Sequence, residues 1–448
     1  MQKKLDNLPE NYCYYAFQGF STQPHGRARP CCINVMKTKT YMDHVAVEKY
    51  PNNYAKDIIK TSNIQEFIND PAIMQLRQEM LENKKPASCE RCWKLEDVGI
   101  KSFRQIQNDI YADNIDTSLK YFDKNGYADK AAITYLDISL GNICNLKCRS
   151  CNPWNSHRWL EEGETLPHYH YNDYDRTTCD LSSNNPWFIK AFKDNYFDDV
   201  LPNVTAINFL GGEPLVVKEH YDWLEHIVEK GWAGNIGLFY NSNGTTIPKR
   251  ILDIWKNFKS VNLALSLDAV GDLAYYVRYP SEWKIIEKNV HKLKEYSKIY
   301  KNFFVQTHAT LSCLNVHDIE ALFNWCLKQY ETWHFVDEET WKHNGYQNAL
   351  PHINIVEEPS FMHMKHLPKE IKIELIKKID ILYRKYNNNS IIPEWEKHSV
   401  NNLLSLQNLL KEDQNPEQWK KFIEATRASD KFRNISIVNY IPWMEKYI

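Results

Sequence analysis

Short apolar runs alternate with helical patterns through the middle of the chain. Leu136, Ile138 and Leu140 alternate with Asp137 and Ser139, which predicts a strand with two unlike faces. Further strand-like runs follow at 204–210, 236–240, 261–267, 303–311 and 352–356. Because helical patterns lie between these runs, we expect a parallel α/β architecture.

The N-terminal region has a different pattern. Gly26 predicts a hairpin turn between strands at 14–20 and 29–36. A helix is expected after Asp70, which suits an N-cap, with Pro71 at its first position. The apolar stripe of this helix consists of Ile73, Leu76 and Met80.

Helical patterns at 368–386, 399–411 and 416–428 fill the C-terminal end, and their apolar stripes suit packing faces. The chain has 448 residues, of which 43% are apolar and 13% aromatic, enough for a sizeable core and two or three domains. The 55 Lys and Arg residues against 57 Asp and Glu give a net charge of −2. This balance argues against nucleic acid or an anionic membrane as a general partner.

The composition also bears on the cellular compartment. The N-terminus lacks an apolar core of signal-peptide length, and no run of about eighteen apolar residues occurs. We therefore expect a cytoplasmic protein. The chain has eleven cysteines, many of them in tight or paired groups, which suits metal binding in a reducing compartment better than a disulfide framework.

Three cysteines follow the strand that ends near Leu140. Cys144, Cys148 and Cys151 have the spacing C-x3-C-x2-C, which is typical of a loop because neither interval repeats. A cubane iron-sulfur cluster is normally held by four cysteines, so three ligands leave one iron open to a small molecule. The alternative is a structural Cys3His zinc site with His157 as the fourth ligand.

This loop after a strand resembles the signature of the radical S-adenosylmethionine (radical SAM) enzymes. The resemblance implies a partial (β/α)6 barrel and a 4Fe-4S cluster whose open iron is chelated by SAM. Reduction would then cleave SAM to a 5′-deoxyadenosyl radical that abstracts hydrogen from substrate. The position before the last cysteine is usually aromatic in that family, whereas here it is Ser150, so adenine contacts must come from elsewhere.

Polar turns at successive strand ends extend the resemblance. In that family a Gly-Gly-Glu-Pro turn lines the methionine amino group of SAM, and further turns face its ribose and carboxylate. The matching residues here are Gly211, Gly212, Glu213 and Pro214, then Asn241, Ser242 and Asn243, then Ser266 and Asp268. Taken singly, each turn also suits a helix cap or a plain strand-to-helix connection. The segment 275–280 resembles a subgroup of these enzymes as well.

A second set of cysteines lies near the N-terminus. Cys13, Cys31, Cys89 and Cys92 resemble the twitch (SPASM-like) module of many radical SAM enzymes, in which four cysteines fully ligate an auxiliary cluster. That cluster is most often of the 4Fe-4S type, and a 2Fe-2S cluster is the alternative. Cys31 is preferred over Cys32 on spacing, and Cys89-x2-Cys92 alone would suit half of a zinc ribbon equally well. In most relatives this module follows the barrel, whereas here it precedes it.

The resemblance predicts three domains and a substrate class. We expect a twitch-like module with its connector at 1–110, a radical SAM barrel at 130–345 and a helical completion at 346–448. Cys313 is a candidate hydrogen-atom donor, although an isolated cysteine is more often a small buried apolar residue. Cys179 is a second catalytic candidate, in a polar insertion at 161–185 that would cover the active site or touch substrate, and its alternative is an exposed loop thiol. The expected reaction oxidises or modifies a peptide or protein side chain, with a flavodoxin or ferredoxin as reductant. The alternatives are a dehydrogenase or epimerase of a small metabolite or sugar, and a zinc-stabilised binding protein without enzymatic activity.

Overall fold

The computed structural model describes residues 8–24, 26, 28–34, 63–112, 115, 119–166, 187–330, 350–390, 392 and 397–448. Within these residues, eight strands form one sheet in the order β2-β1-β3-β4-β5-β6-β7-β8. The strands are β1 (Gly19–Thr22), β2 (Ala28–Arg29), β3 (Tyr135–Ser139), β4 (Ala206–Leu210), β5 (Gly237–Ser242), β6 (Ser260–Ser266), β7 (Phe303–Leu311) and β8 (His352–Ile355).

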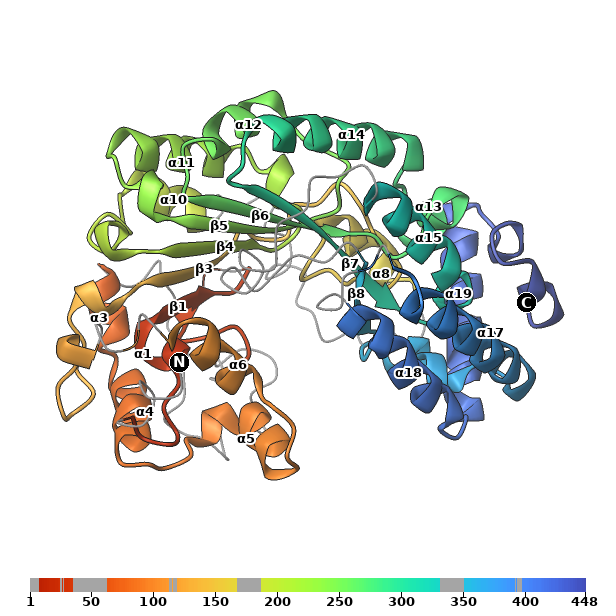
Figure 1. Cartoon of the computed structure of the whole chain (residues 1–448), viewed down its shortest axis with the longest axis horizontal. Helices are drawn as coiled ribbons and strands as arrows, with labels where there is room; N and C mark the ends of the chain where they lie inside the picture. Colours follow the sequence, from red (N-terminus) through yellow and green to blue (C-terminus); the bar gives the residue numbers. More distant parts are fainter. Residues whose placement is uncertain are drawn as a thin grey trace. The chain divides into compact units, whose positions relative to one another are not determined.

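From β3 to β8 the strands lie in the sheet in the order of the chain. β3 pairs in parallel with β4, β4 with β5, and β7 with β8. The helices between successive strands include α10 (Trp187–Lys193), α11 (Glu219–Glu229), α12 (Lys249–Trp255), α13 (Gly271–Val277), α14 (Trp283–Ile299) and α15 (Ile319–Tyr330), as Figure 1 shows. This arrangement confirms the predicted α/β fold of a partial (β/α)6 barrel.

The N-terminal hairpin joins the edge of this sheet. β1 pairs with β2 in antiparallel and with β3 in parallel. The prediction of a strand at 14–20 is wrong at its start, because Tyr14–Gln18 form helix α1. All five of these residues are buried, and Tyr14 stacks on Tyr111 with ring centroids 4.3 Å apart. A short run buried on every side has no periodicity that separates a helix from a strand.

The apolar and the polar face of β3 are both covered, because all five residues of β3 are buried. The polar side chains of β3 find partners within the sheet. Asp137 accepts hydrogen bonds from Ser21 Oγ at 2.8 Å and Asn208 Nδ2 at 2.9 Å, and both residues are paired with Asp137 in the register. Parallel strands are commonly covered on both faces, and here the covered polar face is satisfied internally.

The predicted helices are present. Helix α4 (Pro71–Leu81) begins after Asp70, whose side chain accepts a hydrogen bond from the Ala72 amide. The other N-terminal helices are α3 (Ile64–Ile68), α5 (Glu90–Asp97) and α6 (Phe103–Ile110). The C-terminal helices are α17 (Lys369–Asn387), α18 (Lys397–Lys411) and α19 (Pro416–Arg433). Helix α19 continues to Arg433, beyond the predicted end at 428.

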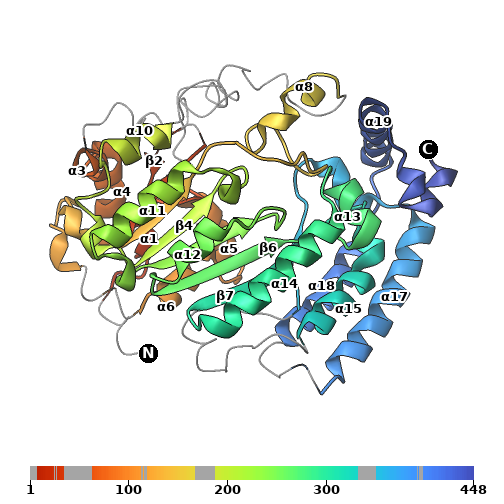
Figure 2. The same ribbon diagram turned by 90° about the horizontal axis from the view of Figure 1, so that it is seen from above.

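The chain divides into two compact units. Unit 1 comprises Met1–Ile143, Thr177–Tyr240 and Asp253–Val261, and unit 2 comprises Cys144–Arg176, Asn241–Leu252 and Asn262–Ile448. Within unit 1, α10 and α11 lie side by side (Figure 2), and the rings of Phe192 and Trp223 stack between them at 4.4 Å. Within unit 2, α17 and α18 run together, and Gln407 Nε2 donates to Ile376 O at 3.1 Å. These units differ from the three predicted domains, which remain a prediction.

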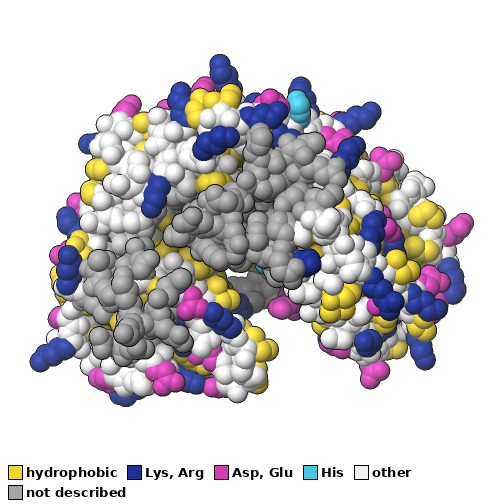
Figure 3. Space-filling model, viewed as in Figure 1, with side chains coloured by type: hydrophobic (Ala, Val, Ile, Leu, Met, Phe, Trp, Pro, Cys, Tyr) yellow, Lys and Arg dark blue, Asp and Glu magenta, His cyan; other side chains and the backbone are white. Residues whose placement is uncertain are grey.

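The described surface carries charges of both signs. On the face shown in Figure 3, basic and acidic side chains are interspersed, in keeping with the small net charge. No helix in the described part of the chain combines the length and the low charge that crossing a bilayer requires.

Candidate functional site

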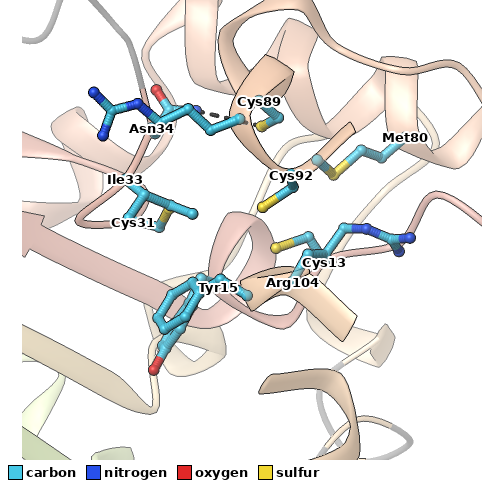
Figure 4. Close-up of a pocket in the computed structure, with 11 residues that line it drawn as sticks. Cys13, Tyr15, Cys31, Ile33, Asn34, Met80, Cys89, Cys92 and Arg104 are labelled. Carbon is cyan, nitrogen blue, oxygen red and sulfur yellow. Dashed lines mark hydrogen bonds between the residues drawn. The ribbon is translucent and has the colours of Figure 1, made fainter. Parts of the chain in front are cut away.

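Four cysteines of unit 1 line one pocket. Cys13 is the N-cap of α1, Cys31 follows β2, Cys89 precedes α5, and Cys92 lies in the first turn of α5. Figure 4 shows these side chains around the same space, with Tyr15, Met80 and Arg104 at its border. The structure therefore brings together the four residues that the sequence groups as ligands of an auxiliary cluster.

In this pocket Cys13 and Cys92 are buried and Cys31 and Cys89 are half-buried, and the negative charge of each thiolate would oppose ionisation of its neighbours. Burial, with a smaller contribution from the charge of Cys92, raises the pKa of Cys13 to about 11. Burial also raises the pKa of Cys31 and Cys89, and in both residues Cys13 adds to the effect. Thiolates packed in this way need positive charge, which is what a metal cluster supplies. The donor set thus fits an iron-sulfur cluster.

Polar contacts support the walls of the pocket. Asn34 Nδ2 donates to Cys89 Sγ at 3.4 Å. Arg104 pairs with Glu96 at 2.7 Å and donates to Tyr12 O at 2.6 Å, just before Cys13 in the chain. These contacts fix the segments that present the thiols, as outer hydrogen bonds do around metal ligands.

The structure separates Cys31 from its neighbour Cys32. Cys31 lines the pocket, whereas Cys32 faces the buried carboxyl of Asp137. Burial raises the pKa of Cys32 to about 12, and the charge of Asp137 is the next contribution. Burial also raises the pKa of Asp137 to about 6, although hydrogen bonds from Ser21, Asn208 and Cys32 oppose this. This geometry favours Cys31 as the ligand, which remains a prediction.

The second group of cysteines lies in unit 2, in the loop after β3. Cys144, Cys148 and Cys151 pack together around Leu146. The loop backbone is held by Lys147 N–H, which donates to Tyr279 O at 2.7 Å, and Arg149 N–H, which donates to Val277 O at 2.8 Å. Trp159 Nε1 and Ser156 Oγ donate to loop carbonyls at 3.0 Å and 2.6 Å. These hydrogen bonds fix the backbone of the loop.

The zinc alternative gains no support from the structure. Nδ1 of His157 accepts a hydrogen bond from the Cys144 amide at 3.3 Å. Across the described ranges, no group of three or more His, Cys, Asp or Glu is arranged to hold a single metal ion. A four-iron cluster is a larger body than one zinc ion, so its cysteines stand farther apart.

Arg278 is a functional candidate that the sequence reasoning missed. Its Nη1 pairs with Asp268 Oδ2 at 2.7 Å, and Asp268 Oδ1 accepts a hydrogen bond from Thr310 N at 2.8 Å. Burial opposes the charge of Arg278, but Cys148 and Asp268 outweigh this and raise its pKa. Its buried Nε has no partner among the described residues. The resemblance of the segment 275–280 to a radical SAM subgroup was the available signal.

The Gly-Gly-Glu-Pro turn lies in unit 1 and packs on the residues just before Cys144. Gly211 and Gly212 have φ of +82° and +50°, and a Cβ on Gly212 would lie 2.1 Å from Ile143 O. Glu213 N–H donates to Ile143 O at 2.8 Å, and the Glu213 carboxylate accepts from Leu215 N at 3.1 Å. Pro214 then opens a short 3-10 helix. The turn therefore includes the cap expected of a plain strand-to-helix connection.

The next polar turn binds the cysteine loop within unit 2. Asn241 and Ser242 end β5, and Asn243 follows them. Asn243 Nδ2 donates to Asn145 Oδ1 at 2.8 Å, and Asn145 Nδ2 donates to Thr245 Oγ1 at 2.7 Å. Asn145 directly follows Cys144, so this turn helps to fix the loop. Ser266 ends β6, two residues before Asp268.

Of the two candidate catalytic cysteines, Cys313 is the one that the structure describes. Cys313 is only 1% exposed and belongs to the hydrophobic core of unit 2. Its thiol donates to His363 O at 3.3 Å. Packing explains this position without a catalytic role. Cys179 lies outside the described residues.

Comparisons with known proteins agree with the motifs. The family model of the Radical SAM superfamily matches residues 138–326, which contain the C-x3-C-x2-C loop and the Gly-Gly-Glu-Pro turn. No curated protein matches the chain significantly.

Among solved structures, the anSMEcpe enzyme with bound AdoMet and Cp18Cys peptide is 14% identical, with 55% of this chain and 58% of that chain covered and a TM-score of 0.32. SuiB of Streptococcus suis bound to its precursor peptide SuiA is 15% identical, with 71% and 60% covered and a TM-score of 0.34. TYW1 with a lysine-pyruvate adduct is 13% identical, with 65% and 89% covered and a TM-score of 0.28. The chain spans less than two thirds of the length of the first two. Likeness at this level carries no argument about substrate.

Proposed function

We propose that this protein is a radical SAM enzyme that modifies a peptide or protein side chain. Cys144, Cys148 and Cys151 would hold a 4Fe-4S cluster with one open iron, to which SAM binds. The observation that carries this proposal is a fixed, buried loop that offers three thiols, one fewer than a cubane cluster needs, within a match to the Radical SAM superfamily. Bound there, the cluster and SAM supply a 5′-deoxyadenosyl radical.

The residues around the loop serve binding and charge balance. Arg278 brings a buried positive charge to Cys148 and keeps its Nε available for an anionic or polar group. Asp268 orients that guanidinium through Nη1. We assign Gly211, Gly212, Glu213 and Pro214 to the methionine end of SAM, and Asn241, Ser242, Asn243 and Ser266 to the other polar contacts.

We further propose that Cys13, Cys31, Cys89 and Cys92 fully ligate an auxiliary cluster. The shared pocket and the mutual repulsion of the buried thiols support this assignment. A fully ligated cluster has no open iron, so it would accept an electron from the substrate or stabilise the fold rather than bind SAM. An external flavodoxin or ferredoxin would deliver the electron that starts the reaction.

The twitch-containing enzymes that the cysteine sets resemble modify peptides and proteins or oxidise small alcohols, and the balanced charge of the chain argues against nucleic acid, so we prefer a peptide or protein substrate. A small metabolite is the alternative substrate. Incubation with defined peptides and with sugar nucleotides separates the two, because only a true substrate increases the yield of 5′-deoxyadenosine.

Anaerobic reconstitution tests the cofactor assignment. The intact protein is expected to be brown, to bind about eight irons per chain, and to form 5′-deoxyadenosine from SAM after reduction. Cys148→Ser should abolish 5′-deoxyadenosine formation and remove about four irons. Cys31→Ser should also remove about four irons, whereas the matched control Cys32→Ser should keep them. Colourless protein that binds zinc and forms no 5′-deoxyadenosine would refute the proposal and favour a zinc-stabilised binding protein.

A further inference from the structure

Two positively charged residues alternate with the cysteines of the loop. Lys147 and Arg149 flank Cys148 in the sequence, and their side chains are 13% and 2% exposed. Buried cations are costly unless they are paired, so their partners decide what charge the loop presents to a bound cluster.

Arg149 is neutralised by helix α19. Its Nη2 pairs with Asp430 Oδ1, and its Nε donates to Tyr276 O at 3.1 Å. The same Asp430 Oδ1 accepts from Tyr276 Oη at 3.0 Å, and Oδ2 accepts from Ile437 N at 2.7 Å. Asp430 therefore has defined partners on both carboxylate oxygens, and its position is fixed.

Lys147 is neutralised by Glu162, which α19 also holds. Lys147 Nζ lies 2.9 Å from Glu162 Oε2, and the Glu162 side chain is fully buried. Arg433 Nε donates to both oxygens of Glu162 at 2.8 Å and 2.9 Å, and Ser429 Oγ donates at 2.7 Å. Arg433 Nη2 also donates to Lys147 O at 3.0 Å. One turn of α19 thus reaches both cations of the loop.

We propose that residues 429–433 of α19 form an electrostatic latch that sets the reduction potential of the cluster held by the cysteine loop. This inference rests on the proposed function and assigns Asp430 and Arg433 as positioning residues. A cluster gains one negative charge on reduction, so a nearby uncompensated cation stabilises the reduced form and an uncompensated anion destabilises it. In a buried site these charges are only weakly screened.

The latch predicts shifts of the reduction potential in opposite directions when Asp430 and Arg433 are replaced, which a purely structural role of these residues does not predict. Asp430→Asn removes an anion beside Arg149, so the reduction potential should rise. Arg433→Met removes a cation and leaves Glu162 with Lys147 alone, so the potential should fall. If the two residues only held the loop in place, their loss would shift the potential in one common direction or not at all.

The test is a redox titration followed by EPR on the full-length, reconstituted protein without substrate. The relevant cluster is identified by the EPR signal that changes when SAM is added. At a fixed ambient potential we expect the ratio of reduced to oxidised cluster to rise at least threefold in Asp430→Asn and to fall at least threefold in Arg433→Met. A tenfold change corresponds to 59 mV for one electron.

Matched controls separate charge from packing. Asp430→Glu and Arg433→Lys keep the charges. Because the Coulomb interaction with the cluster is then preserved, the ratio of reduced to oxidised cluster should stay within about twofold of that in the unmodified protein. Glu424→Gln, on the exposed part of α19 and 3.9 Å from Lys420, should have no effect. If Arg433→Met fails to fold, Lys147→Met removes a cation from the same network and should lower the potential as well.

The outcomes distinguish this inference from the proposed function. Shifts of the same sign, or unchanged potentials with full iron content, overturn the latch and leave the radical SAM assignment intact. If the protein shows no EPR signal that responds to SAM, both the latch and the radical SAM assignment are refuted.

Discussion

The glycine pair at the end of β4 offers a test of how the Gly-Gly-Glu-Pro turn is built. Gly212 has φ of +50°, and an added Cβ would lie 2.1 Å from Ile143 O and 2.7 Å from Ile143 C. Both contacts are with backbone, which cannot move aside as a flexible side chain can. Gly212→Ala therefore has two separate costs, one conformational and one steric.

The first cost is that of a left-handed backbone in a residue with a Cβ, about 1–2 kcal/mol. The second comes from separating the turn from Ile143, which also breaks the hydrogen bond from Glu213 N–H to Ile143 O at 2.8 Å. Loss of a buried hydrogen bond costs roughly 1 kcal/mol or more. We expect Gly212→Ala to lower the free energy of unfolding by about 2–4 kcal/mol in total.

Two other glycines of unit 1 provide controls. Gly231 has φ of +78° with nothing within 4 Å of an added Cβ, so Gly231→Ala should show the conformational cost alone. Gly234 also has open space and an ordinary φ, so Gly234→Ala should be neutral or slightly stabilising. Thermal unfolding should rank Gly234→Ala highest and Gly212→Ala lowest, with Gly231→Ala between them.

SAM affinity, measured by equilibrium dialysis, should fall in Gly212→Ala and stay unchanged in the two control variants. Equal thermal stability of Gly212→Ala and Gly231→Ala would refute the steric part of the reasoning. Unchanged SAM affinity in a destabilised Gly212→Ala would refute the assignment of this turn to the cofactor.

Three further predictions concern buried polar groups. Burial raises the pKa of Asp137 from 3.8 to about 6, so the folded state holds the carboxyl proton more tightly than the unfolded chain does. The stability that this proton gives the folded state is lost as the pH rises from about 4 to 6. Denaturation of the unmodified protein compared with Asp137→Asn should show this decline, of about 3 kcal/mol at most. Cys313→Ala should lower stability by about 1 kcal/mol while 5′-deoxyadenosine formation is kept, because Cys313 lies in the core. Arg77→Met should lower the melting temperature, with a loss of about 2–4 kcal/mol, because Arg77 donates to Gly126 O at 2.8 Å and to Ile68 O inside the protein.

The strands were predictable where an apolar run ended in polar or glycine-rich turns. The run at 303–311 coincides with β7, and the runs at 204–210, 236–240, 261–267 and 352–356 differ from the observed strands by one or two residues. The strand predicted at 29–36 is wrong over 30–34, because β2 ends at Arg29. The pattern failed at 14–18, where burial on every side removed the periodicity. It did not indicate the partners of the polar residues of β3, because Ser21 and Asn208 come from neighbouring strands that are distant in the sequence.

The cysteines of the candidate site were predictable from the sequence, whereas the charged residues around them were not. Cysteine spacing is local, so it grouped both sets of thiols, and the structure brings each set together. The charged residues around the loop follow no local pattern. Arg149 and Asp430 are 281 residues apart, and Asp430 lies beyond the predicted end of its helix. A charged residue near a helix end is ordinarily expected in solvent, so only the fold could assign it to the loop.

The two cysteine groups share nearby buried arginines but differ in the number of ligands that they offer. In the N-terminal pocket, Arg104 is paired with Glu96, and the four thiols would complete the ligand set of a cluster by themselves. Beside the three-cysteine loop, Arg278 keeps a buried Nε without a partner within the described residues. An unsatisfied buried donor costs about 1–3 kcal/mol, and it is relieved when an acceptor such as a carboxylate binds. Arg29 Nε, beside Cys31, also lacks a partner within the described residues, so it is the incomplete ligand set that favours the three-cysteine loop as the place where the cosubstrate binds.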